Sequence, residues 1–371
     1  MPKQPERMPT NLSEIFEYLA HAQPVMLKIA SGTDFSRQSM RRASFVLCTL
    51  KSSSFVDADL TGASFTSCDL SNAVFTDCIL SGTRFVDCDL ARADFRDCQL
   101  ETTQFVAGKA VGAAYQGAAI AKASFAKTDI SQTDFRDATV ERSAFLDCPI
   151  EGLSVTGAVL SSVMLTKADL RDIDLTDVHI DTAVFSEADL SGKDLTGQSL
   201  QRCTFYKGKF TQTRLDAARL DGSVFADCDF DGASASGISG NMTCFTKSRM
   251  DGLDLSNSNL SMSNFVQSSI KGAIFNGSQL YSAAFTEADA KAAQFERCNL
   301  QQADFSRADL SAGNFGAATF SNTKFHAARR DGALFAGASG SVIETDQDRA
   351  IAELYTPRIV VLDGDDIRGT R

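Results

Sequence analysis

The sequence has no tryptophan, three histidines and six prolines in 371 residues. The histidines, His21, His179 and His326, lie far apart, so no histidine-based catalytic triad is visible. Glycine-rich phosphate loops, HExxH, paired CxxC motifs and EF-hand loops are all missing from the sequence. We therefore expect a protein that is not an enzyme, with no catalytic residues, no cofactor and no metal ion.

Segments for export or membrane insertion are missing as well. Met1 to Asn11 is polar and lacks the apolar stretch of a secretory signal peptide. No apolar run approaches the roughly 18 residues that a spanning helix needs. These absences predict a cytoplasmic protein with no membrane partner, although secretion by a specialised system without a cleaved signal stays open.

Basic residues are fewer than acidic ones, with 36 Lys and Arg against 47 Asp and Glu, for a net charge of −11. A negative chain is repelled by the phosphate backbone, so we expect no direct binding of nucleic acid. A protein partner with a basic surface is permitted.

What the sequence has instead is a period of five residues. From Phe35 to Phe335, residues at every fifth position are nearly all apolar, and no insertion breaks this register. Of the 27 phenylalanines, only Phe16 lies off it. A period of five fits neither an α-helix nor a flat strand. It predicts short extended segments, each closed by a turn, with one large and one small side chain pointing inward.

Cysteines follow the same register, two residues before the large position, where small residues predominate. Cys244 is the exception among the ten cysteines. A residue that alternates with Ala, Ser and Thr is selected for size, so we interpret these cysteines as small buried groups. The nine on register are Cys48, Cys68, Cys78, Cys88, Cys98, Cys148, Cys203, Cys228 and Cys298.

Blocks such as AVFTD (73–77), ADFRD (93–97), ADLSG (188–192) and ADFSR (303–307) resemble the A(D/N)LXX motif of the pentapeptide-repeat family. The resemblance implies an all-β fold, a right-handed quadrilateral β-helix with 20 residues per coil. Positions 45, 65, 85 and onward to 325 are phenylalanine except at Leu165, which predicts one continuous aromatic ladder. We expect about 15 coils and a rod on the order of 70 Å long.

The ends of the chain predict short helical caps, and we divide it into a capping segment (1–30), a β-helix (31–340) and a C-terminal helix and tail (341–371). Asn11 and Glu14 begin one amphipathic stretch, and Thr345 and Asp348 begin another that ends near Tyr355. The run Ile359 to Leu362 predicts either packing on the last coil or pairing with a second chain. Within the rod we expect local thinning or a bend at 233–240, where the large positions are weakest.

Sorting charged residues by coil face singles out the face centred on positions 35, 55, 75 and onward, with 13 acidic and six basic residues. We call nine of its carboxylates the acidic face and take it as the candidate site for a basic partner, the alternative being a solvated surface without a partner. They are Asp57, Asp77, Asp94, Asp97, Asp134, Asp137, Asp174, Asp177 and Asp194.

The function that we expect is a non-enzymatic scaffold or adaptor for proteins, acting as a monomer or as a homodimer through the C-terminal segment. Resemblance to bacterial pentapeptide-repeat proteins implies a link to specialised secretion, such as type VI systems. Two alternatives are a DNA mimic that binds DNA gyrase or topoisomerase, and a secreted effector. Duplex DNA carries one charge per about 1.7 Å, so ~70 Å would need about 40 negative charges, whereas the net charge of this chain is −11.

Overall fold

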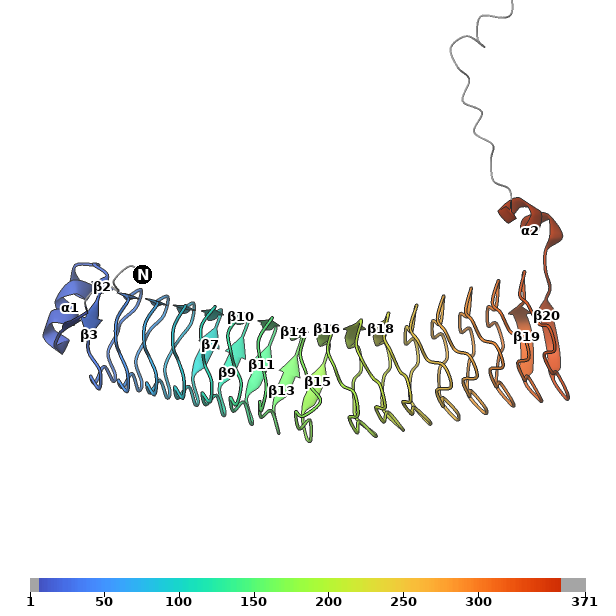
Figure 1. The fold of residues 1–371 in the computed structure, drawn as a ribbon, viewed down its shortest axis with the longest axis horizontal. Helices are drawn as coiled ribbons and strands as arrows, with labels where there is room; N and C mark the ends of the chain where they lie inside the picture. The colour runs from blue at the N-terminus through green and yellow to red at the C-terminus, as the bar shows by residue number, and fades with distance from the viewer. Residues whose placement is uncertain (1–6, 355–371) are drawn as a thin grey trace, which may run out of the picture.

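Residues 7–354 are described by a computed structural model, in which they form a long solenoid of stacked coils (Figure 1). Consecutive coils pair in parallel at a spacing of 20 residues, as in Phe45 with Phe65 and Asp304 with Lys324. The expected fold, an all-β solenoid of the quadrilateral β-helix type, is confirmed. It has about 17 turns rather than 15, because pairing begins at Met8, opposite Lys28, and continues to Ile343.

The strands are short and gather on two faces of the solenoid. An 11-stranded sheet holds β2 (Val25–Met26), β4 (Ser44–Val46), β5 (Ser64–Thr66), β6 (Arg84–Val86), β8 (Gln104–Val106), β10 (Ser124–Ala126), β12 (Ala144–Leu146), β14 (Met164–Thr166), β16 (Val184–Ser186), β17 (Thr204–Tyr206) and β18 (Val224–Ala226). A five-stranded sheet holds β7 (Gln99–Glu101), β9 (Ala119–Ala121), β11 (Thr139–Glu141), β13 (Val159–Ser161) and β15 (His179–Asp181). The other pairs are β1 (Met8–Pro9) with β3 (Lys28–Ile29) and β19 (Thr319–Lys324) with β20 (Ser339–Ile343).

The period of five comes from a corner that recurs in nearly every block. Two residues after a large inward residue the backbone turns left-handed, for example at Asp57 with φ 57°, with Asp172 as an exception. The turn closes with a hydrogen bond from the Ala58 N–H to the Phe55 carbonyl, 2.9 Å long. Glycine and Asp tolerate this backbone well, and they are frequent at the corners. Each block is therefore an extended segment and a turn, as the sequence predicts.

The side chains at the small inward position also form hydrogen bonds inside the coil. The Ser53 hydroxyl donates to the Ala30 carbonyl at 2.9 Å, and the Cys78 thiol donates to the Phe55 carbonyl at 2.7 Å. The nine cysteines on register are buried and free, and burial raises the pKa of Cys228 to about 12. Their interpretation as small buried groups is confirmed, with an added role as hydrogen-bond donors inside the coil.

The large inward residues stack as aromatic ladders. Phe45 and Phe65 have ring centroids 5.0 Å apart and an interplanar angle of 4°. A second ladder, on the face centred on position 35, meets the first edge to face, with Phe55 and Phe65 at 84°. These rings are buried, apart from Phe335 at the C-terminal end, and they fill the interior of the rod.

Both helices lie where the sequence places them, but their positions relative to the rod differ. Helix α1 (Leu12–Ala20) starts at Asn11, whose side chain accepts the Glu14 N–H at 2.9 Å, and it packs its apolar face on the first coils. Helix α2 (Gln347–Leu354) starts after Asp346, whose carboxylate accepts the Arg349 N–H, not at Thr345. In Figure 1, α2 lies beside the rod.

The expectation of a bend at 233–240 is wrong. The coil bonds there are regular, with the Ala235 N–H 3.0 Å from the Asp254 carbonyl. Ile238 and Leu260 extend into the space that Gly240 leaves empty, since a Cβ at Gly240 would lie within 4 Å of both side chains. The irregular part of the rod lies instead between residues 147 and 201, where several coil bonds are missing.

Candidate functional site

The nine carboxylates of the acidic face occupy two different positions in the coil. Four of them, Asp94, Asp134, Asp174 and Asp194, precede the large inward residue, and each accepts the backbone N–H two residues later, at 2.9 to 3.1 Å. These four side chains therefore stabilise the turns. The other five, Asp57, Asp77, Asp97, Asp137 and Asp177, sit at left-handed corners and are exposed.

Arginines neutralise part of the first group. Arg96 Nη2 lies 2.6 Å from Asp94 Oδ2, and Arg136 makes the same contact with Asp134. Burial works against ionisation of both carboxyls, but the arginine hydrogen bonds outweigh it and hold each pKa below its usual value. The sequence analysis missed this pairing, although the signal, an Arg two residues after an Asp, was present.

The corner carboxylates form a row along the N-terminal part of the rod. Asp57, Asp77 and Asp97 lie in three consecutive coils, on the order of 4.8 Å apart. Asp97 also extends over the next corner, because a Cβ added to Gly117 would sit 2.5 Å from Asp97 Oδ1. Asp137 follows two coils after Asp97, on the far side of Gly117. We call Asp57, Asp77, Asp97 and Asp137 the carboxylate column.

The structure does not bring all nine residues into one surface. The ladder on this face is continuous from Asp34 to Ser154 but does not connect Ser154, Asp174 and Asp194. Asp174, Asp177 and Asp194 therefore lie at or beyond an interruption. Within residues 7–354, the column has a single ion pair, between Asp57 and Arg37 at 3.8 Å, and Asp77, Asp97 and Asp137 have none.

Other chemistry is limited in the described part of the chain. No group of three His, Cys, Asp or Glu side chains that could hold a metal ion occurs there. No helix of this part is long and apolar enough to cross a membrane. A hollow of ≈ 570 Å³ lies between α1 and the first coils and is lined by residues such as Phe16, Leu19 and Met40.

Comparison with protein families gives three matches, all to pentapeptide repeats. A pentapeptide repeat region model matches residues 48–125, a model of nine repeat copies matches 194–234, and a model of eight copies matches 248–286, 263–302 and 285–326. The chain belongs to the pentapeptide-repeat family. No curated protein sequence matches it.

Several solved pentapeptide-repeat structures are similar to it. QnrB1, a plasmid-mediated fluoroquinolone resistance protein, is 22% identical with a TM-score of 0.41, over 50% of this chain and 92% of that one. A protein from the Arabidopsis thaliana thylakoid lumen is 26% identical with a TM-score of 0.26, over 28% and 72%. HetL of the cyanobacterium Nostoc sp., involved in heterocyst differentiation regulation, is 18% identical with a TM-score of 0.19, over 68% and 91%.

Proposed function

We propose that this pentapeptide-repeat protein is a non-enzymatic scaffold or adaptor that binds a protein with a basic surface along its carboxylate column. The observation that carries this proposal is the state of the column itself. Its side chains are exposed, and Asp77, Asp97 and Asp137 have no ion pair in residues 7–354. Neighbouring acidic residues, by contrast, are used in turns and ion pairs.

Like charges at this spacing repel one another, and a partner with Lys or Arg residues at a matching spacing would relieve that repulsion. Complementary charge of this kind mainly raises the association rate and selects among partners. Each exposed pair contributes only about 0 to 1 kcal/mol, so several pairs must form together for a stable complex. A row in successive coils allows this, because the strand spacing fixes the separation of its carboxylates.

A matched pair of variants tests the column. The column variant changes Asp57, Asp77, Asp97 and Asp137 to Asn, which tolerates the left-handed corner and removes four charges. The control variant removes four charges from other left-handed corners through Asp87→Asn, Asp147→Asn, Asp227→Asn and Glu187→Gln. Both variants should fold, as checked by circular dichroism.

Proteins captured from bacterial lysate by wild type and by the control variant, but not by the column variant, are candidate partners. Each is then purified and titrated against the three chains at low and high salt. We expect at least a tenfold weaker affinity for the column variant and a reduced salt dependence. Equal affinity for the column and control variants would contradict the proposal.

Mimicry of DNA towards gyrase or topoisomerase is the second candidate, and the column is the feature that favours it. It spans only a few coils, however, whereas duplex DNA presents one charge per about 1.7 Å. Purified gyrase therefore belongs among the titrated proteins, and inhibition of supercoiling by wild type but not by the column variant would favour mimicry. A type VI secretion link, a role as secreted effector and a cytoplasmic location stay predictions from the sequence.

The C-terminal end of the rod supports the proposal of a homodimer. Leu334 and Phe335 are 59% and 37% exposed, and β20 pairs with β19 on one side alone within the described residues. An unpaired strand edge over an apolar core favours association with a second copy. The run Ile359 to Leu362, also expected to take part, lies outside the described residues. Light scattering should give a dimer that Leu334→Glu converts to a monomer.

A further inference from the structure

Consecutive coils are held together by a regular set of backbone bonds, and these bonds fail in one part of the rod. In the regular pattern, the Ile130 N–H donates to the Pro149 carbonyl at 3.0 Å and the Phe135 N–H donates to the Ser154 carbonyl at 2.8 Å. One coil later, the equivalent N–H groups have no backbone acceptor in the coil that follows. These groups belong to Ile150, Gly152, Val155 and Gly157.

A second gap follows directly on the first. The N–H groups of Leu175, Asp177, Ile180 and Thr182 have no backbone partner in the following coil. Regular bonds resume with the Leu195 N–H, which donates to the Arg214 carbonyl at 2.7 Å. Two consecutive junctions between coils are thus open over part of their circumference.

The opposite side of the rod stays closed through both gaps. Strands β12, β14, β16 and β17 remain paired in register, with Phe145 opposite Leu165, Leu165 opposite Phe185, and Phe185 opposite Phe205. This side is the 11-stranded sheet, which lies along the inner edge of the bowed rod in Figure 1. The face that opens in both gaps, centred on Val155 and Leu175, lies two blocks away around the square coil and is therefore opposite to it.

Local sequence explains why the bonds fail here. Pro149 has no N–H to donate, so it removes one bond to the preceding coil, directly before the first gap. Four branched side chains, Leu153, Val163, Ile173 and Val178, lie close together at small inward positions, where Ala, Ser, Thr and Cys predominate. Such a cluster needs more room and moves the coil walls apart, whereas the coil bonds beside Ile238 and Leu253, which lie at the same position further along, stay regular.

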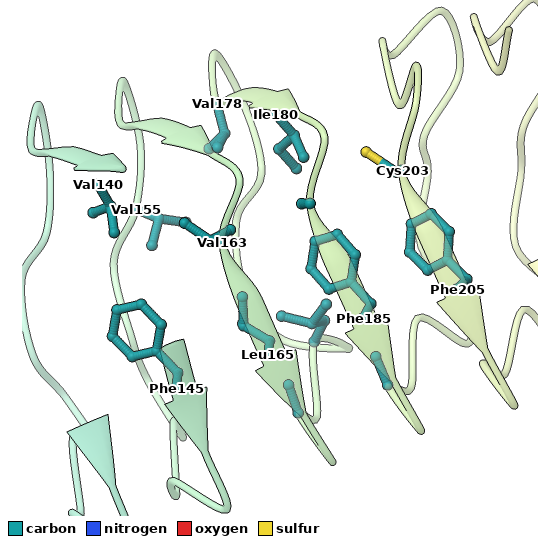
Figure 2. Close-up of a cluster of buried hydrophobic side chains, with 14 of the residues drawn as sticks. Val140, Phe145, Val155, Val163, Leu165, Val178, Ile180, Phe185, Cys203 and Phe205 are labelled. Atoms are coloured by element: carbon teal, nitrogen blue, oxygen red, sulfur yellow. The ribbon is translucent and has the colours of Figure 1, made fainter. Parts of the chain in front are cut away.

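The interior of this part is also packed differently. Leu165 interrupts the aromatic ladder between Phe145 and Phe185, as Figure 2 shows. Two small apolar cavities of ≈ 40 and ≈ 30 Å³ lie among its aliphatic side chains, and Leu175 is half-buried rather than buried. Without stacked rings, the core here resists sliding and opening less than the aromatic core of the two arms.

We propose that residues 147–201 form a hinge at which the rod bends, with the paired strands β12, β14, β16 and β17 as its axis. Opening breaks no backbone–backbone bond on the gapped face, because those bonds are already absent and water can solvate the free groups. It does break the hydrogen bond that Lys193 Nζ donates to the Ile173 carbonyl across the second gap. The two arms, before and after the hinge, keep their complete ladders and move as rigid parts. Bending would change the direction of the C-terminal arm relative to the carboxylate column.

Distance measurements with matched spin-label pairs test the hinge in the full chain. Gln132→Cys with Gln212→Cys spans the gaps, and Gln212→Cys with Ala292→Cys spans the same number of coils in the C-terminal arm. All three positions are exposed left-handed corners in one row, and each pair is about 19 Å apart. Cys244→Ser removes the one native cysteine that is not buried.

We expect the distance distribution across the gaps to be about twice as broad as that of the control pair, because only the first pair reports bending. Equal widths for the two pairs would overturn the proposal. Hydrogen exchange in the unmodified chain gives an independent measurement. The amides of Ile150, Val155 and Leu175 should exchange rapidly, while Ile130 and Leu215, whose N–H groups are bonded, stay protected. Equal protection of both sets would also overturn it.

Discussion

Truncation of one buried ring tests how the rod is held together. Phe205 is fully buried in β17, with ring centroids 4.8 Å from Phe185 and 5.0 Å from Phe225 in stacked geometry. It also meets Phe210 edge to face at 5.1 Å. Phe205→Ala therefore removes three aromatic contacts and leaves a cavity in a coil whose walls are fixed by backbone bonds on two sides.

The expected loss of free energy of unfolding is about 3 to 5 kcal/mol, the usual range for buried Phe to Ala changes. The upper half of this range is expected, since each aromatic pair adds about 0.5 to 1.5 kcal/mol beyond the buried area. Tyr206→Ala is the control, because Tyr206 follows in the same strand but is 41% exposed.

Urea denaturation followed by circular dichroism measures both variants, since a chain without tryptophan offers little intrinsic fluorescence. Tyr206→Ala should change the free energy of unfolding by less than about 1 kcal/mol. Suppose instead that Phe205→Ala lowers the free energy of unfolding by less than about 1 kcal/mol, or by no more than the control does. The phenylalanine ladder would then not be what stabilises the core.

Three further predictions follow from single features. The pKa of Asp134 in the folded chain lies below its unfolded value of about 3.9. Burial raises this pKa, but the hydrogen bonds from Arg136 lower it by more. Its stabilisation is thus present above that pH and lost as pH falls through the folded pKa, and the Tm of Asp134→Asn should fall less steeply than that of wild type between neutral and acidic pH. Cys244 alone of the ten cysteines is not buried, so a maleimide should label the native protein once and label all ten thiols only after unfolding, as mass spectrometry would show. Gly340 has φ 108°, and a Cβ there would lie 1.8 Å from the Phe320 carbonyl oxygen. Gly340→Ala should therefore detach β20 and make it the first site of limited proteolysis. Gly332→Ala is the control and should not do so, because the space around Gly332 is open.

Much of the fold could be predicted from the sequence because one physical rule repeats. Each block must bury one large and one small side chain and then turn, so a residue such as Phe65 has the same environment as Phe85 one coil later. Asn11 and Glu14 also predict the start of the first helix, because the N-cap hydrogen bond joins residues only three positions apart.

The position of the hinge could not be read in the same way. The glycine at position 240 looks like a defect, yet side chains from neighbouring blocks fill the space beside it. The block register stays perfect through residues 147–201. The defect coincides with a cluster of branched side chains at the small positions, and such crowding affects the structure only once coils stack. The candidate site was predicted in part: the row of carboxylates is visible in the sequence, but the hydrogen bonds that occupy Asp94 and Asp134 depend on turn geometry.

The unbroken 20-residue coil has a consequence for how such a chain can change its length. Loss or duplication of a single five-residue block would shift the phase of every later coil by a quarter turn, so side chains aligned along one side would continue on the next. Only changes by four blocks preserve the phase. In a chain of this architecture, the alignment of Asp57, Asp77, Asp97 and Asp137 is a constraint on the spacing of genetic insertions as well as on the identity of residues.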